Sequence, residues 1–124
     1  MLRVLIVEDN HIFRETFKMR LNDQFPSMVV EETSNGDEAL QEVGETHPDL
    51  IFMDVRLPGA NGLQLTRKIK KDLPGIHIAI LTDHDLPEYR QAAVEYGADR
   101  FFVKSSLKWD EVETLVKSIQ AGVS

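Results

Sequence analysis

The sequence contains no cysteine, and its acidic residues outnumber its basic ones. Without cysteine the chain forms neither disulfides nor thiolate metal sites. It has 14 lysine and arginine residues against 21 acidic ones, and the net charge of −7 disfavours direct binding of this segment to nucleic acids or anionic membranes. No apolar stretch approaches about 18 residues, so no transmembrane helix is expected. An apolar strand starts at Leu2, which leaves no room for a signal peptide, and we therefore expect a cytoplasmic protein.

Short apolar runs alternate with segments of helical periodicity along the 124 residues. The apolar runs predict strands over 2–7, 28–32, 50–54, 76–81 and 101–104. The amphipathic segments predict helices over 11–25, 37–46, 62–72, 86–96 and 107–121. The fourth of these helices would begin after a capping box formed by Asp85 and Glu88.

Five repeats of strand and helix are typical of an α/β domain. The pattern predicts a five-stranded parallel, doubly wound sheet with its five helices on both faces. The length suits one domain with one core, over residues 1–121. Residues 122–124 are small or polar at the end of the chain, and we expect them to begin a linker.

Four predicted strands end in residues suited to phosphate chemistry. Glu8 and Asp9 follow the first strand, Asp54 ends the central apolar run, Thr82 follows the fourth strand and Lys104 ends the fifth. Taken singly, these are ordinary helix caps, solvated acids, a strand-end threonine and a solvated lysine. In a parallel sheet, however, every strand delivers its carboxyl end to the same edge, where ligand sites gather. The fold would therefore bring all five side chains together.

As a set, these residues favour the transfer of a phosphoryl group. Clustered carboxylates repel one another unless a cation is present, and oxygen ligands without histidine or cysteine favour Mg²⁺. The Thr82 hydroxyl and the Lys104 ammonium suit phosphate oxygens. We therefore expect Asp54 to accept a phosphoryl group, with catalysis mostly by positioning and charge neutralisation.

Over residues 2–121 the chain resembles a response-regulator receiver domain of bacterial two-component signalling, whose fold is flavodoxin-like. The resemblance rests on motifs that occur in order at the predicted strand ends: Glu8-Asp9, Asp54 with Leu57-Pro58-Gly59 and Gly62 after it, Thr82, and Lys104 with Phe101 three residues before it. It implies a signalling phosphoacceptor rather than an enzyme. A sensor histidine kinase or a phosphotransfer protein would phosphorylate Asp54.

The resemblance also implies a ligand set for Mg²⁺. Asp9, Asp54 and the backbone carbonyl of Arg56 would bind the ion directly, and Glu8 would bind it through water.

The remaining implied roles concern catalysis and switching. Thr82 and Lys104 would bind the phosphoryl oxygens, and Phe101 would rotate inward on activation together with Thr82. The surface of the fourth helix, fifth strand and fifth helix would then change its partners, with a phosphorylation-dependent homodimer as one outcome. From the sequence, ordinary core packing remains an equal explanation for Phe101.

Two residues depart from the pattern of the family. Ser105 stands where many receivers have a proline joined by a cis peptide bond, and we expect a trans bond here because a non-proline cis bond costs about 2.5–4 kcal/mol. Asp83 follows Thr82, where a small residue is usual, so its carboxylate should lie at the rim of the phosphoryl pocket, where Arg56 is a candidate to neutralise it.

The serine after the lysine is similar to receivers attached to helix-turn-helix DNA-binding output domains. We therefore expect control of transcription through an output domain outside this chain. A stand-alone phosphorelay receiver is the alternative.

Two other classes of protein share parts of this pattern. A nucleotide- or flavin-binding protein would need a glycine- or hydroxyl-rich loop after the first strand, but that loop begins with Glu8 and Asp9. A Mg²⁺-dependent aspartyl-phosphate phosphatase of the haloacid-dehalogenase type would carry a second acid two residues after the nucleophile, where Arg56 stands. Release of phosphate from a generic phosphomonoester would separate an enzyme from a signalling domain.

Overall fold

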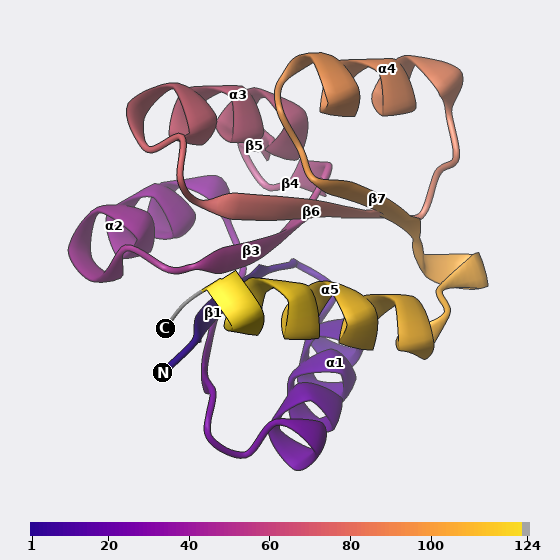
Figure 1. Cartoon of the computed structure of the whole chain (residues 1–124). Helices are drawn as coiled ribbons and strands as arrows, with labels where there is room; N and C mark the ends of the chain where they lie inside the picture. Colours follow the sequence, from indigo (N-terminus) through magenta and orange to yellow (C-terminus); the bar gives the residue numbers. More distant parts are fainter. Residues whose placement is uncertain (123–124) are drawn as a thin grey trace.

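The computed structural model describes residues 1–122, and a single parallel sheet runs through the middle of the molecule (Figure 1). The sheet consists of β1 (Arg3–Val7), β2 (Val29–Thr33), β3 (Leu50–Asp54), β6 (His77–Thr82) and β7 (Arg100–Val103). Its strand order is β2-β1-β3-β6-β7, and all neighbouring strands are parallel. The predicted sheet is confirmed.

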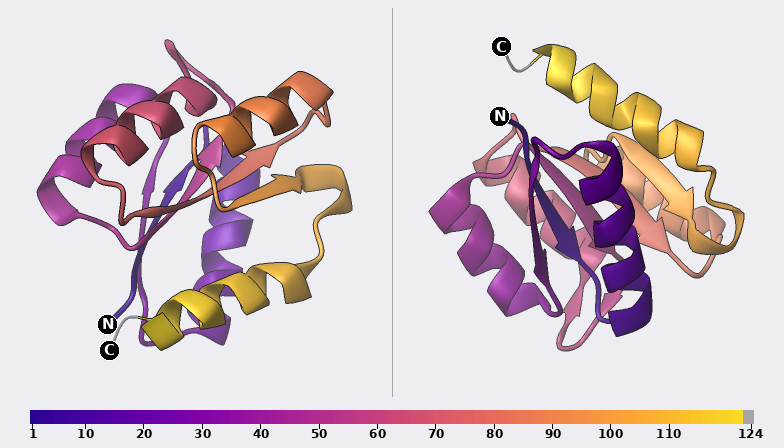
Figure 2. Two further views of the ribbon diagram at one scale, coloured as in Figure 1. Left: turned by 45° about the horizontal axis from the view of Figure 1, so that its top comes forward. Right: turned by 90° about the horizontal axis from the view of Figure 1, so that it is seen from below.

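Helices cover both faces of the sheet, as a doubly wound fold requires. They are α1 (His11–Gln24), α2 (Gly36–Thr46), α3 (Gly62–Asp72), α4 (Pro87–Glu95) and α5 (Trp109–Gly122). α1 and α5 lie on one face, and α2, α3 and α4 lie on the other (Figures 1 and 2). Within the described residues, no helix combines the length and apolar character needed to cross a membrane.

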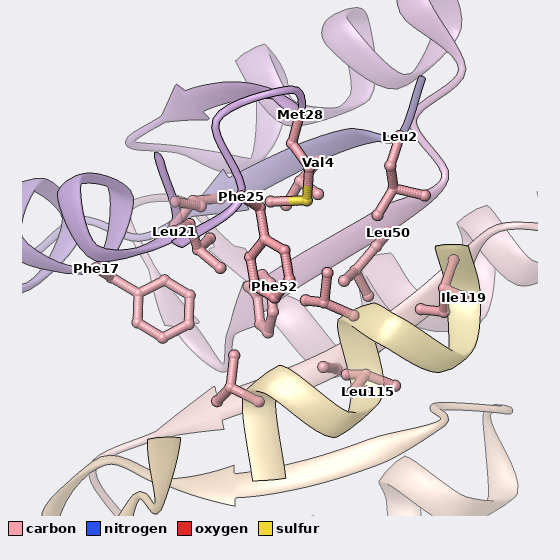
Figure 3. Close-up of a cluster of buried hydrophobic side chains, with 14 of the residues drawn as sticks. Leu2, Val4, Phe17, Leu21, Phe25, Met28, Leu50, Phe52, Leu115 and Ile119 are labelled. Carbon is pink, nitrogen blue, oxygen red and sulfur yellow. The ribbon is translucent and has the colours of Figure 1, made fainter. Parts of the chain in front are cut away.

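The central strand β3 separates two hydrophobic clusters. Phe52 points into the cluster under α1 and α5, where Phe17, Leu21 and Leu115 pack around it (Figure 3). Ile51 and Met53 point into the second cluster, under α2, α3 and α4. All four residues from Leu50 to Met53 are fully buried. This burial on both faces explains the unbroken apolar run and gives Asp54 a rigid support.

The structure contains one pair of strands that the sequence did not predict. β4 (Arg56–Leu57) and β5 (Ala60–Asn61) form an antiparallel hairpin directly after Asp54. Gly59 occupies its turn with a positive φ of 69°, a conformation that glycine adopts without steric cost. Strands of two residues are too short to show a hydrophobic period, so only the Pro58-Gly59 turn signal was visible.

The predicted start of the fourth helix was wrong. Leu86 is the N-cap residue of α4 and makes no capping hydrogen bond through its side chain. The Asp85 carboxylate instead accepts a hydrogen bond from Arg90 Nε at 2.5 Å. An ion pair with a residue five positions along the chain therefore replaces the capping box. Pro87 lies in the first turn, where its fixed φ suits the start of a helix.

The C-terminal part also differs from the prediction in detail. A short 3₁₀ helix, η1 (Lys104–Ser106), follows β7, and α5 begins at Trp109 rather than at residue 107. The peptide bond between Lys104 and Ser105 is trans as expected, since residues 1–122 contain no cis bond. α5 continues to Gly122, and the rest of the expected linker, residues 123–124, lies outside the described residues.

Candidate functional site

Asp54 lies at the carboxyl end of β3 and is 5% exposed. Gly62, at the start of α3, packs directly against its backbone: a Cβ atom at Gly62 would lie 1.8 Å from the Asp54 carbonyl oxygen. The Gly62 amide also donates a hydrogen bond to the Val55 carbonyl at 2.7 Å. The buried Thr66 hydroxyl donates to the Gly62 carbonyl at 2.8 Å. Close contact with a residue that lacks a side chain therefore fixes the backbone that carries Asp54.

Three acidic side chains meet at this end of the sheet, as predicted. Carboxylate oxygens of Glu8, Asp9 and Asp54 all lie within 4.8 Å of one another. Glu8 is fully buried at the end of β1, whereas Asp9 is exposed. Glu8 Oε2 accepts a hydrogen bond from the Asn10 amide at 3.0 Å. An all-oxygen cluster with one open side fits a hard divalent cation such as Mg²⁺.

Lys104 brings a positive charge into the same cluster. Its ammonium pairs with Glu8 Oε1 and lies 3.6 Å from Asp54 Oδ2 and 3.8 Å from Asp83 Oδ2. Only 7% of its side chain is exposed, and Nζ lies 4.8 Å from the centre of the Phe13 ring. Burial lowers the pKa of Lys104, but the hydrogen bond with Glu8 and the nearby carboxylate charges outweigh burial and raise it. Lys104 therefore remains an ammonium ion.

The single lysine does not balance the acidic cluster. Burial, followed by the hydrogen bond and negative charge of Glu8, raises the pKa of Asp54 to about 8, although Lys104 acts in the opposite direction. In the absence of a further cation, Asp54 thus tends to hold a proton near neutral pH. A divalent cation beside Glu8 and Asp54 would remove the repulsion, so the electrostatics of the site fit a bound metal ion.

Thr82 ends the strand next to β3, one residue beyond the partner of Asp54, whereas Phe101 lies three residues before Lys104 on β7. Thr82, the last residue of β6, is 1% exposed, and its hydroxyl accepts a hydrogen bond from the His84 amide at 3.1 Å. Phe101, on β7, lies opposite Ile80 of β6. It is partly buried against the cluster under α2, α3 and α4. The Arg90 guanidinium covers its ring at 4.7 Å. The structure therefore brings together Glu8, Asp9, Asp54 and Lys104 and places Thr82 at the same end of the sheet, but it does not place Phe101 among them.

Asp83 lies at the rim of the site as predicted, but Arg56 is not its partner. The Asp83 side chain is 67% exposed and reaches the Lys104 ammonium, which places it at the rim of the site. Arg56 does not pair with it in the part of the chain that the structure describes. Instead, Arg56 Nε donates a hydrogen bond to the Tyr89 hydroxyl at 3.3 Å. The Asp83 carboxylate therefore pairs with Lys104 rather than with Arg56.

Sequence reasoning missed two supporting residues, both on α1. Arg14 Nη1 donates to the Glu8 carbonyl at 2.7 Å, and its Nε lies 3.7 Å from Glu32 Oε2. Phe13 forms the apolar wall beside Lys104. The signal was available for Arg14, because a basic side chain in the first turn of a helix after a strand-terminal acid points back toward that strand end.

Fold and site together define a class of protein: a doubly wound α/β domain with clustered carboxylates, a hydroxyl and an ammonium at the carboxyl edge of its sheet. Comparison with known proteins identifies this class more closely. The chain belongs to the response regulator receiver domain family, whose model matches residues 4–120.

The curated relatives include response regulators and proteins named as transcriptional regulatory proteins, such as YhcZ of Bacillus subtilis. The chain is 33% identical to the response regulator protein VraR of Staphylococcus saprophyticus over 119 residues, which cover 94% of this chain and 56% of VraR. This chain thus spans about half the length of the curated relatives it matches. A LuxR-family two-component response regulator from Aurantimonas has 33% identity and a TM-score of 0.84, over 97% of this chain and 85% of that one.

Another relative was solved as a complex. The response regulator TrrA of Thermotoga maritima, in complex with Mg²⁺ and BeF, is 31% identical with a TM-score of 0.83. The match covers 96% of this chain and 99% of TrrA.

Proposed function

We propose that the domain accepts a phosphoryl group on Asp54 from a sensor histidine kinase or a phosphotransfer protein, in a reaction that requires Mg²⁺. The observation that carries this proposal is the position of Asp54. Its carboxylate is buried at the end of β3, within 4.8 Å of two further acids and 3.6 Å from the Lys104 ammonium. The family of the chain and the Mg²⁺–BeF complex of TrrA support the same chemistry.

The proposed cofactor would lie between the acidic side chains. Asp9, Asp54 and the backbone carbonyl of Arg56 are the proposed direct ligands, with Glu8 acting through water. When bound, Mg²⁺ supplies positive charge toward the phosphoryl oxygens and removes the repulsion among the carboxylates.

The residues of the chain have separate tasks in the transfer. An Asp54 carboxylate oxygen attacks phosphorus, the bond between phosphorus and the donor histidine nitrogen breaks, and the imidazole keeps the electron pair. The Thr82 hydroxyl donates a hydrogen bond to one phosphoryl oxygen, and the Lys104 ammonium pairs with another. This chemistry serves signalling: the phosphoryl group is stored on the protein rather than turned over as by an enzyme.

The proposed output follows from the contacts of Thr82 and Lys104 with the phosphoryl group. Movement of Thr82 and Lys104 toward the phosphoryl group would alter the β6–α4 loop and β7, where Phe101 acts as the switch residue. The α4, β7 and α5 surface would then form new contacts, including a phosphorylation-dependent homodimer. Because curated relatives extend well beyond this domain, we propose that the surface controls transcription, in the cytoplasm, through an output domain outside this chain.

Intact-mass measurement tests the proposal directly. With acetyl phosphate and Mg²⁺, the wild-type protein should gain one phosphoryl group, and Asp54→Ala should gain none. Chelation of Mg²⁺ should stop labelling of the wild type. Equal labelling of the two proteins would disprove the assignment of Asp54.

A further inference from the structure

Three carboxylates share the single ammonium group of Lys104, and Asp83 differs from the other two. Glu8 and Asp54 are buried, whereas the Asp83 side chain is 67% exposed. Asp83 belongs to residues 83–86, which join β6 to α4 outside any helix or strand. Among residues 1–122, Lys104 is the only cation within ion-pair distance of the Asp83 carboxylate. Asp83 therefore places a carboxylate at the solvent side of the site, beside the Lys104 ammonium.

The position of Asp83 matters for the group that leaves during phosphoryl transfer. The attacking and leaving atoms lie roughly in line on opposite sides of phosphorus. Since Asp54 attacks from the buried side, the leaving group departs toward solvent. Asp54 Oδ2 and Asp83 Oδ2 lie 3.6 and 3.8 Å from the same Lys104 ammonium, with Asp54 on the buried side and Asp83 on the solvent side of the site. A leaving group on the outer side therefore departs close to the Asp83 carboxylate.

We propose that Asp83 is a specificity-determining residue that selects donors with a phosphorus–nitrogen bond over acyl phosphates. The inference rests on the proposed role of Asp54 as phosphoacceptor. When an acyl phosphate reacts, the phosphorus–oxygen bond breaks and a carboxylate anion leaves, so negative charge develops beside Asp83. When a phosphoramidate reacts, the phosphorus–nitrogen bond breaks and the nitrogen keeps the electron pair; with a proton taken from water, it leaves as a neutral amine. Asp83 opposes the first departure by charge repulsion and does not oppose the second.

Coulomb's law sets the size of the effect. Because Asp83 is mostly exposed, its interaction with a leaving anion is close to that in water, about 1 kcal/mol at 4 Å before screening. That energy corresponds to about a fivefold difference in rate. The discrimination should weaken in about 1 M salt, where the screening length falls to about 3 Å.

The test compares two small donors on the full chain in the presence of Mg²⁺. Acetyl phosphate and phosphoramidate are each supplied to the wild type and to Asp83→Asn, and the rate of labelling at Asp54 is followed by intact mass. Asparagine keeps the size of the side chain and removes its charge. Asp85→Asn is the matched control, because Asp85 is an exposed acid in the same loop that pairs with Arg90 rather than with Lys104.

The expected result is a change in donor preference. The ratio of the phosphoramidate rate to the acetyl phosphate rate should fall about fivefold in Asp83→Asn at low salt and by less in about 1 M salt. An unchanged ratio with Asp54 labelled, or an equal fall in Asp85→Asn, would overturn the inference while leaving the phosphoacceptor role intact. Failure of both donors to label wild-type Asp54 would instead overturn the proposed function. Far-ultraviolet circular dichroism and urea midpoints should be the same for all three proteins, since both substituted residues are exposed.

Discussion

Replacing Asp54 by asparagine should stabilise the metal-free protein at neutral and alkaline pH. The folded protein raises the pKa of Asp54 from 3.8 to about 8, first by burial and then through Glu8. Between pH 3.8 and about pH 8, the Asp54 carboxyl is deprotonated in the unfolded chain but protonated in the folded protein. By linkage, this group makes stability fall as the pH rises from about 4 to about 8, with no further loss above that range. Asparagine does not ionise, so the variant lacks this loss.

The expected gain in the free energy of unfolding follows from the two pKa values of Asp54. The interval from 3.8 to about 8 covers about four pH units, and at about 1.4 kcal/mol each this sets an upper limit of about 6 kcal/mol. Water reaches the cluster through the exposed Asp9 side and screens the charge, so the measured gain should be smaller, about 2 kcal/mol. The gain should be close to zero at pH 4.

Urea unfolding of the metal-free proteins between pH 4 and pH 9 would measure this difference. Asp23→Asn is the control: Asp23 is exposed on α1, and the change should stay within about 0.5 kcal/mol. Added Mg²⁺ should raise the stability of the wild type and so reduce the difference in the free energy of unfolding between the wild type and Asp54→Asn. If the wild type and Asp54→Asn show parallel stability curves over this pH range, then burial and Glu8 do not place Asp54 under electrostatic strain.

Three further predictions concern the support of the site, its cation and its switch. Gly62→Ala should lower the free energy of unfolding by more than about 2 kcal/mol and abolish labelling of Asp54, because the new Cβ would meet the Asp54 carbonyl oxygen. Gly44→Ala, with open space around it in α2, should be neutral or stabilise by up to about 1 kcal/mol in the same urea titration. Asp9→Asn should weaken Mg²⁺ binding at least about tenfold by calorimetry, and unchanged affinity would remove Asp9 from the ligand set. Lys104→Ala should still be phosphorylated but lose phosphorylation-dependent dimerisation in light scattering, whereas retained dimerisation would argue against a switch through β7.

The elements that the sequence predicted well are those with strong burial patterns. β3 is apolar from Leu50 to Met53 because both of its faces are covered, and its bounds match the prediction at both ends. The features that were missed are very short or depend on a contact between exposed side chains. The β4–β5 hairpin is too short to show a period, and the ion pair of Asp85 with Arg90 competes with a capping box of equally good spacing. Local patterns do not show which of two local partners a side chain selects.

For the site, too, the sequence predicted which residues meet but not which of them pair. Strand ends predicted that Glu8, Asp54 and Lys104 would meet, but not that the ammonium would pair most closely with Glu8. In the proposed function Lys104 binds a phosphoryl oxygen, and any movement of its ammonium toward that oxygen weakens the contact with Glu8. A buried carboxylate left without a partner costs several kcal/mol, so that movement is unfavourable while Glu8 has no other cation. A divalent cation held by the acidic cluster would compensate Glu8 and release Lys104 for the phosphoryl group. Cation binding and the movement of Lys104 should therefore be coupled, and the exposed carboxylate of Asp83 adds a second, weaker hold on the same ammonium.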